Sequence, residues 1–413
     1  MLVQRTEQHI IDRQSKWYKM LEGKCHIAKN IYNHGNYLIR QEFIKSGKWL
    51  RYIDVEKQVK NDIEYPDYWE WNLANSGQQV LRQLDKNWKS FFKIIKDWKI
   101  NKEKYQRKPK IPKYLSKNGL LEFVLTTNQV KLKEDNLIHF PKSMCGFIIK
   151  PYFINDERFI KFNQCRIVPR NDKIIVELIY TISFNVEIKN NNKICSIDLG
   201  VDNFVALVNN IGNKPIIING KGLKSCNQYY NKQISKLKSG LDKNKNSIKC
   251  SHLMNSITNK RNFKINKFMN EASNYVVNYC LNNDIATLIV GKNNEWKQNS
   301  KLGKVNNQNF VGIPFNLFIQ KLDYKCREVG IKFTLTDEKY TSGTSFLDNE
   351  LPIKENYNKS RRIKRGLFKT NTGKFINADV NAAYQVMKKV FCDVEIPADR
   401  GFVINPVRVN FRF

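Results

Sequence analysis

The stretch Ile194–Phe204, with the sequence ICSIDLGVDNF, decides the fold predicted for this chain. A hydrophobic strand at 194–198 ends in Asp198, a glycine turn follows, and further strands are predicted at 203–208 and 215–219. An acidic residue that interrupts a hydrophobic strand is a candidate functional residue. The alternative is a structural role, in which the side chain of Asp198 caps the turn.

A second carboxylate lies far downstream, in the stretch Asn377–Ala383, where a helix is predicted to begin near Asp379. Two carboxylates delivered from a strand end and a helix start can hold Mg²⁺ for phosphodiester hydrolysis. Asp379 alone could equally be a helix N-cap. The two residues in this order, with strands and helices between them, indicate a metal-dependent nuclease site.

The charge of the chain points to a polyanionic partner. The 413 residues, enough for two to three domains, are 41% hydrophobic and carry 71 Lys and Arg against 38 Asp and Glu, a net charge of +33. Such an excess is typical of nucleic-acid-binding proteins. A lysine-rich proteome of low genomic GC is the alternative, but it rarely produces this imbalance.

The cysteines and the apolar segments exclude other classes. The nine cysteines are widely scattered and form no CxxC pair, so a Cys₄ zinc site is not expected and the thiols fit a reducing compartment. No N-terminal apolar signal region and no run of about 18 apolar residues occurs. We therefore expect a cytoplasmic protein without a membrane partner, and the positive charge of the chain favours association with the nucleoid.

The first half of the chain combines a strand, a helical block and a set of short strands. A strand is predicted within residues 1–13, helices between about 15 and 98, an extended basic linker at 104–114, and period-two strands at 120–188 that favour a small β-barrel. One of these helices is predicted near 78–98. Candidate nucleic-acid contacts on this helix and the linker are Arg82, Lys86, Lys89, Lys93, Lys108, Lys110, Lys113 and Tyr114.

The second half alternates strands and helices. Helices are predicted at about 224–242, 250–282 and 314–329, and strands at 286–290 and 332–338. Further basic candidates for nucleic-acid contact are Lys260, Arg261, Lys264, Arg361, Arg362 and Arg365. For each basic cluster the alternative is a solvated surface, and residues 391–413 are predicted only as a tail.

Together these segments resemble the TnpB family, the RNA-guided nucleases of insertion sequences and relatives of type V CRISPR effectors. The resemblance implies an α/β fold plus a β-barrel: an RNase H-like RuvC nuclease domain preceded by a wedge barrel that carries a helical recognition insertion. The implied boundaries are 1–14 and 106–190 for the barrel, 15–105 for the helical domain and 191–413 for the nuclease domain. A target-nucleic-acid-binding insert without zinc ligands is expected at about 341–376.

The third carboxylate is where the sequence departs from the family. The fourth strand of the nuclease fold usually ends in Glu, but here that position is Gly291, which cannot bind a metal ion. Glu338, before Tyr-Thr-Ser as in a glycine-bearing branch of the family, can replace it, and so can Glu295 in the loop after Gly291. We expect Glu338, because a strand end is fixed whereas a loop must first be ordered. Asp337 is a poorer candidate, because it points to the opposite face of the strand from Glu338. If neither glutamate supplies the third carboxylate, the site would be inactive.

The resemblance implies a DNA endonuclease that binds two Mg²⁺ ions through Asp198, Glu338 and Asp379, and no zinc. Its partners would be a guide RNA, of the omega type or a crRNA, and double-stranded DNA matched to the guide beside a short adjacent motif. The alternatives are a nuclease-inactive guided repressor, a compact type V CRISPR effector, a strand-joining transposase and a structural RNA-binding protein. Monomer and dimer both stay open.

Overall fold

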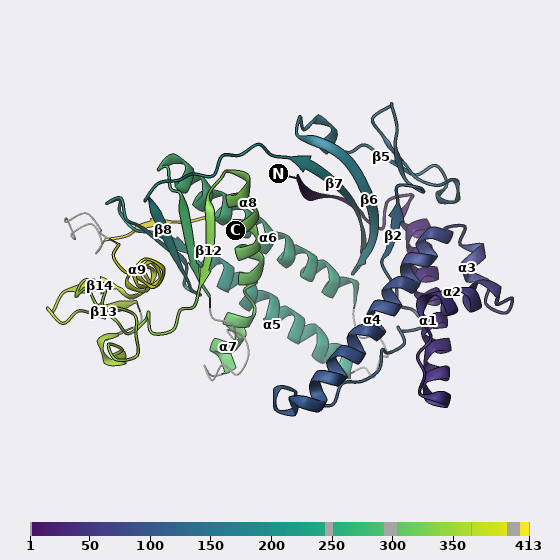
Figure 1. Cartoon of the computed structure of the whole chain (residues 1–413), viewed down its shortest axis with the longest axis horizontal. Coiled ribbons are helices and arrows are strands. Elements are labelled where there is room, and N and C mark those ends of the chain that lie inside the picture. The colour runs from purple at the N-terminus through teal and green to yellow at the C-terminus, as the bar shows by residue number, and fades with distance from the viewer. Residues whose placement is uncertain (1, 244–250, 293–303, 365, 395–404, 413) are drawn as a thin grey trace. The chain divides into compact units, whose positions relative to one another are not determined.

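The computed structural model describes residues 2–243, 251–292, 304–364, 366–394 and 405–412 (Figure 1). The chain divides into two units, Met1–Phe184 and Asn185–Phe413, here called unit 1 and unit 2. No helix in the described part of the chain combines the length and the apolar surface that a bilayer crossing requires.

Helices fill the part of unit 1 that the periodicity predicted to be helical. They are α1 (Tyr18–Ser46), α2 (Tyr52–Asn61), α3 (Asp67–Glu70) and α4 (Ala74–Ile100), followed by the short 3₁₀ helix η1 (Lys102–Lys104). Helix α1 ends where Gly47 adopts a left-handed conformation with a φ of 69°, which its backbone allows without strain. The predicted helical block thus consists of four helices joined by three connections.

The strands of unit 1 form two antiparallel sheets. The larger has the order β1-β7-β6-β2 and consists of β1 (Leu2–Ile11), β2 (Phe123–Thr126), β6 (Phe159–Arg170) and β7 (Lys173–Ser183). The smaller consists of β3 (Lys131–Leu132), β4 (Ile138–His139) and β5 (Ile148–Ile149), with the 3₁₀ helices η2 (Lys142–Met144) and η3 (Phe153–Asn155) nearby in sequence. The N-terminal strand pairs along its length with β7. Closure of these strands into a barrel stays a prediction.

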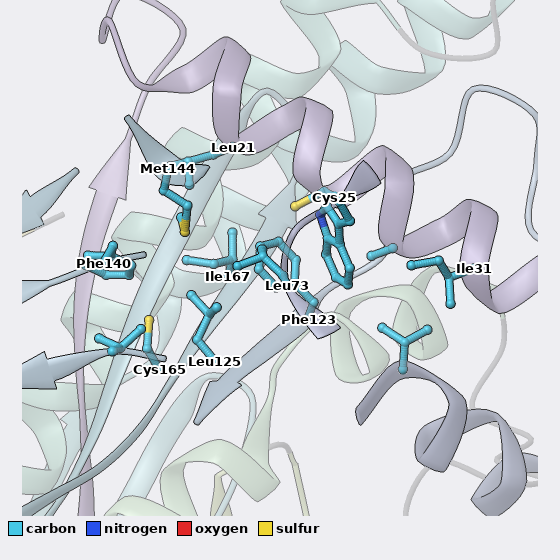
Figure 2. Close-up of a cluster of buried hydrophobic side chains, with 14 of the residues drawn as sticks. Leu21, Cys25, Ile31, Leu73, Phe123, Leu125, Phe140, Met144, Cys165 and Ile167 are labelled. Atoms are coloured by element: carbon cyan, nitrogen blue, oxygen red, sulfur yellow. The ribbon is translucent and has the colours of Figure 1, made fainter. Parts of the chain in front are cut away.

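One hydrophobic core joins the helices of unit 1 to its sheets (Figure 2). Leu21 and Cys25 of α1 lie in the same cluster as Phe123 of β2 and Ile167 of β6, and each is at most 2% exposed. Leu73, the residue before α4, is buried in this cluster as well. The start of α4 is therefore held in place by apolar packing.

The sheet of unit 2 has the order β12-β11-β8-β9-β10-β15. Its strands are β8 (Ile194–Leu199), β9 (Asn203–Asn209), β10 (Ile216–Asn219), β11 (Thr287–Gly291), β12 (Lys332–Thr336) and β15 (Val407–Val409). Strand β11 runs parallel to both β8 and β12, so the carboxyl ends of these three strands meet at one edge. Strand β11 therefore lies between β8 and β12 in the sheet.

Two predictions for these strands are wrong in detail. Strand β12 ends at Thr336, two residues before Glu338, which therefore lies just beyond the strand and not at its end. The C-terminal tail includes a strand, because Val407–Val409 pairs in parallel with Ile216–Ile218 of β10 and extends the sheet. A three-residue strand is too short to give a periodic signal in the sequence.

Helices cover both faces of this sheet (Figure 1). The helices of unit 2 are α5 (Lys221–Lys243), α6 (His252–Asn282), α7 (Lys304–Val311), α8 (Phe315–Glu328) and α9 (Ala378–Val390). Residues of α6 and α8 share one hydrophobic cluster with the sheet, and α9 forms a second cluster with it. Between β12 and α9 lie the 3₁₀ helix η4 (Lys359–Arg361) and the hairpin of β13 (Leu367–Lys369) and β14 (Phe375–Asn377).

Candidate active site

Strand alternation directs Asp198 toward α9. Along β8, Cys195 and Ile197 belong to the cluster that contains α6 and α8. Ser196 lies on the other face, where its hydroxyl donates a 2.7 Å hydrogen bond to the carbonyl of Ala383 in α9. Asp198, two residues after Ser196, shares that face. Among the described residues, no donor makes a hydrogen bond to the Asp198 carboxylate. The structure therefore does not support the alternative in which this side chain caps the turn.

Asp379 is near the first turn of α9, but it is not the cap of that helix. The side chain of Asn377 accepts hydrogen bonds from the backbone N–H groups of Asp379, at 3.0 Å, and Val380, at 3.2 Å. The carboxylate of Asp379 is thereby left for other partners. It accepts hydrogen bonds from Asn203 Nδ2 at 2.7 Å and from Arg362 Nη2 at 3.0 Å.

Gly291 and Glu338 occupy complementary positions. A Cβ atom built on Gly291 would lie 2.7 Å from both Cγ and Oε1 of Glu338, and 3.0 Å from Cγ2 of Val386 in α9. The side chain of Glu338 therefore fills the space in which a side chain at the end of β11 would begin. Glu295, the other predicted replacement, lies outside the described residues.

Charge links the three carboxylates into one group. The pKa of Asp198 is raised well above its ordinary value, first because its carboxylate is largely removed from water and then because the carboxylates of Glu338 and Asp379 repel its charge. The Arg362 guanidinium acts in the opposite direction. The carboxylate of Asp337 pairs instead with Lys389 near the end of α9, at 3.6 Å. Within the described ranges, no three His, Cys, Asp or Glu side chains have the spacing of a preformed metal site.

Arg362 and Asn203 are the two polar neighbours that the sequence did not assign to this site. Arg362 was predicted as a nucleic-acid contact, but its guanidinium pairs with Asp379 while its side chain stays 39% exposed. Asn203 begins β9 directly after the turn that follows Asp198. The sequence signal for the contact of Asn203 with Asp379 is weak: a polar residue at the start of a buried strand.

The insert predicted at 341–376 is held to α9 by packing and polar contacts. Phe346 stacks on Tyr384 with ring centroids 4.2 Å apart, and the backbone N–H of Phe346 donates to Asn381 Oδ1 at 2.9 Å. Asn381 also donates to the carbonyl of Thr344 at 2.8 Å. The stretch Asn377–Ala383, with the sequence NADVNAA, therefore both presents Asp379 and anchors the insert.

Glu350 organises the interior of this insert. Its Oε2 accepts hydrogen bonds from Ser345 N–H at 2.7 Å and from Arg361 at 2.6 Å, and its Oε1 accepts one from Asn371 at 3.0 Å. Burial raises the pKa of Glu350, but the hydrogen bonds from Arg361 and Ser345 outweigh it, and the net pKa lies below the usual value. Arg361, with a side chain that is 16% exposed, thus serves the fold of the insert.

The basic residues predicted on α4 are exposed. Arg82 lies over the ring of Tyr52 at 4.7 Å, and Lys89 pairs with Asp85 at 2.7 Å. Both remain open to solvent, as do Lys86 and Lys93. This helix therefore presents a row of cations on the face opposite its buried residues.

The basic residues predicted on α6 separate into two kinds. Lys260 and Lys264 are exposed. Arg261 is half-buried and donates to Asn227 Oδ1 at 2.7 Å and to the Gly312 carbonyl at 2.8 Å, so it fixes α5 and the connection before α8. Arg365 lies outside the described residues.

Helix α1 fixes part of the segment predicted as a basic linker. Asn36 and Arg40 donate to the carbonyl of Pro112 at 3.2 and 3.0 Å, and Asn33 exchanges two hydrogen bonds with the backbone of Leu115. The segment is therefore bound along a helix and is not a freely solvated linker. Its predicted contact residues are exposed: Lys108, Lys110, Lys113 and Tyr114.

Two family models match separate parts of the chain. Residues 177–297, which include Asp198 and Gly291, match the family model OrfB_IS605, a probable transposase. Residues 315–386, which include Glu338 and Asp379, match the Cas12f1-like TNB domain. No curated protein gives a significant match.

Several solved structures are similar over most of the chain. Cas12f1 in its complex with sgRNA and target DNA has 14% identity and a TM-score of 0.36, over 92% of this chain and 98% of that chain. The mini RNA-guided endonuclease Cas_phi3 has 10% identity and a TM-score of 0.43, over 94% and 92%. CasPhi-2 bound to crRNA has 9% identity and a TM-score of 0.39, over 94% and 98%. The two family models, matched in this order along the chain, support a TnpB-type family protein.

Proposed function

We propose that this protein is an RNA-guided DNA endonuclease of the TnpB type, with one RuvC-type site formed by Asp198, Glu338 and Asp379. The observation that carries the proposal is the position of the Glu338 side chain in the space beside Gly291, within the electrostatic reach of Asp198. A carboxylate missing from the end of β11 would thereby be supplied from the segment just after the neighbouring strand β12.

The donor set fits Mg²⁺. Hard divalent cations prefer carboxylate oxygens. The pKa of Asp198 is raised first by burial and then by repulsion from Glu338 and Asp379, and a bound cation would relieve that repulsion. Asp198, Glu338 and Asp379 would hold the metal ions. When bound, Mg²⁺ supplies an activated water and neutralises charge on the leaving oxygen. The chain itself orients one of these groups, Asp379, by two contacts: Asn203 donates to its carboxylate, and the Asn377 cap fixes its backbone at the start of α9.

The remaining assignments follow from the same proposal. Base pairing with a guide RNA, of the omega type or a crRNA, would select double-stranded target DNA. The net charge of +33 would hold both nucleic acids, with exposed cations of α4, α6 and the linker as contacts; Arg261 is left out because its guanidinium is engaged within unit 2. We assign residues 1–14 and 106–190 to a wedge barrel, 15–105 to a recognition domain and 191–413 to the nuclease domain, in a bacterial cytoplasmic protein associated with the nucleoid.

The rival functions make different predictions. An inactive guided repressor is motivated by Gly291, but the placement of Glu338 beside it favours a complete site. A compact CRISPR effector would use the same protein chemistry, and neighbouring genes would distinguish it. A transposase would join transposon ends without RNA.

The decisive experiment uses the full chain purified with RNA expressed from its native flanks. With Mg²⁺, it is incubated with a plasmid that carries a guide-matched target beside a randomised flank. We expect particular flanks to be depleted through double-strand breaks, and this activity to be lost in Glu338→Gln but kept in the matched control Asp337→Asn. Specific retention of DNA without breaks would instead establish the repressor.

A further inference from the structure

Ser196 is a fully buried polar residue on the face of the sheet that α9 covers. Its side chain is 0% exposed. Its neighbours in register are Val208 of β9 and Ile289 of β11, and both belong to the hydrophobic cluster that includes α9. A hydroxyl in such surroundings costs free energy unless it forms a hydrogen bond. Among the described residues, the hydroxyl of Ser196 finds its acceptor in α9, at the carbonyl of Ala383, 2.7 Å away.

This hydrogen bond lies close to two of the three proposed metal ligands. Asp198 is two residues further along β8, on the same face and about 6.6 Å away along the strand. Asp379 is four residues before Ala383 in α9, about 6 Å away along the helix axis. Because both segments are short and regular, a shift of Ala383 relative to Ser196 displaces Asp379 relative to Asp198 by a similar amount.

A second hydrogen bond connects α9 to the next strand of the sheet. Asn203 of β9 donates to Asp379 Oδ2 at 2.7 Å. The two contacts hold α9 at points about one helical turn apart, and two points fix the direction of a helix as well as its place on the sheet. Apolar contacts are non-directional, whereas a hydrogen bond weakens steeply when its geometry changes. The polar contacts therefore set the position of α9 more narrowly than packing does.

The packing of α9 limits the direction in which it can shift. Ala383 is 0% exposed and carries only a methyl group, so the helix backbone lies close to the sheet. Further along the helix, Val386 Cγ2 would lie 3.0 Å from a Cβ atom built on Gly291. Movement toward the sheet is thus already blocked. Loss of the Ser196 contact leaves α9 free to slide along the sheet or to move away from it.

We propose that Ser196 is a positioning residue of the nuclease site: its hydrogen bond to Ala383 limits how far Asp379 can move from Asp198. The inference rests on the proposed function, since it assigns a role toward that site. Mg²⁺ demands near-ideal octahedral geometry at about 2.0–2.1 Å, whereas Ca²⁺ accepts flexible geometry at about 2.3–2.6 Å. A loosened α9 should therefore weaken the binding of Mg²⁺ more than that of Ca²⁺. A role in stability alone predicts no change in this preference.

The test uses two pairs of chains in which the members differ by one hydroxyl group. The parent and Ser196→Ala form the first pair. Ser196→Thr and Ser196→Val form the second, and because their side chains have nearly the same shape, this comparison removes the effect of side-chain volume. Ser273→Ala is the matched control in the same unit. Ser273 is also 0% exposed, but its hydroxyl donates to the carbonyl of Asn270 within α6, at 3.0 Å.

Calorimetry of the full chain, freed of RNA at high salt, measures the affinity for Mg²⁺ and, separately, for Ca²⁺. Loss of the hydroxyl in either pair should lower the Mg²⁺ affinity about 10-fold or more, as the loss of a residue that orients a metal ligand does. The Ca²⁺ affinity should change by less than about 3-fold, because Ca²⁺ tolerates the altered geometry. Ser273→Ala should lower the unfolding temperature by several degrees, as Ser196→Ala does, and leave both affinities unchanged.

A kinetic measurement on the guide-loaded complex complements the calorimetry. Ser196→Ala should lower kcat for cutting of the matched DNA at least several-fold while KM for that DNA stays unchanged, because Ser196 is buried and contacts no substrate. Ser273→Ala should keep the parent value of kcat.

Each outcome decides the inference. Equal Mg²⁺ affinities within either pair, an equal loss of Mg²⁺ and Ca²⁺ affinity, or the same loss in Ser273→Ala would overturn the positioning role and leave the proposed function intact. Absence of Mg²⁺ binding by the parent chain would overturn both.

Discussion

Replacing Gly291 tests whether Glu338 has taken the place of a carboxylate at the end of β11. In Gly291→Ala the new Cβ would meet Glu338 Cγ and Oε1 at 2.7 Å and Val386 Cγ2 at 3.0 Å. Either the Glu338 side chain leaves its position or α9 shifts. We therefore expect this single methyl group to reduce both stability and metal-dependent cutting.

The expected magnitude follows from the contacts. Overpacking a buried site costs about 1–3 kcal/mol, and removing a glycine from the unfolded chain returns up to about 1 kcal/mol. Gly240→Ala in α5 is the matched control, because nothing lies within 4 Å of a Cβ at that position. It should be neutral or stabilising, whereas Gly291→Ala should lower the unfolding temperature by several degrees.

The assay is a double-mutant cycle with Glu338→Ala, measured by thermal and urea unfolding. Truncating Glu338 removes the two closest atoms, so Gly291→Ala should cost about 1–2 kcal/mol less in the Glu338→Ala background than in the parent. A functional counterpart is Gly291→Glu combined with Glu338→Ala. It returns a carboxylate to the end of β11 and should recover part of the Mg²⁺ binding that Glu338→Ala loses, measured by calorimetry.

A coupling energy below about 0.3–0.5 kcal/mol would mean that the two residues do not share this space. If Gly291→Ala cut DNA as well as the parent, the position of the Glu338 side chain beside Gly291 would not matter for cutting. In that case Glu338 would not be the third carboxylate, and the proposed replacement would have to be abandoned.

Three further predictions concern other residues of unit 2. Asp198→Asn should reduce plasmid cutting more than about 100-fold, because losing a residue that only orients a metal ligand already costs about 10- to 100-fold. Its affinity for RNA and DNA, measured by filter binding, should not change. Cutting that persists in this variant would show that Asp198 is not part of the site. Arg362→Ala should lower the unfolding temperature in the absence of Mg²⁺, because Asp379 loses the cation that it pairs with; adding Mg²⁺ should restore most of that temperature. The control is Arg327→Ala on α8, which removes an exposed ion pair with Asp323 and whose unfolding temperature Mg²⁺ should not restore. Glu350→Gln should cost about 1.5–3 kcal/mol at pH 7; because the pKa of Glu350 is lowered in the folded state, that difference should shrink as the pH falls below the ordinary value of 4.5, and a constant difference in urea unfolding would contradict the reasoning.

Much of unit 2 could be predicted because its signals are local. The alternation in β8 and the long apolar stripe of α6 are each contained in one segment, and the structure places both elements close to the predicted ranges. The same holds for α9, which begins one residue before Asp379. Strand β15 was missed because three residues carry no period, and its pairing with β10 depends on a contact across most of unit 2.

The candidate site required contacts that leave no local pattern. The sequence placed Asp198 and Asp379 but could not show that Arg362 pairs with Asp379, or that Asn203 orients it. It also could not distinguish Arg261, which binds within unit 2, from its exposed neighbour Lys260. Basic side chains that are neighbours in sequence can have different roles, because the fold buries one and leaves the other exposed.

The sequence by itself determined the longer strands and helices of unit 2, the two carboxylates at a strand end and a helix start, and the large positive charge. These are properties of single segments or of composition. Only the tertiary structure decided which space the side chain of Glu338 occupies and how the insert is held. The reason is geometric: parallel pairing of β11 with β12 brings Gly291 opposite Thr336, so that a glutamate two residues later fills the space that glycine leaves.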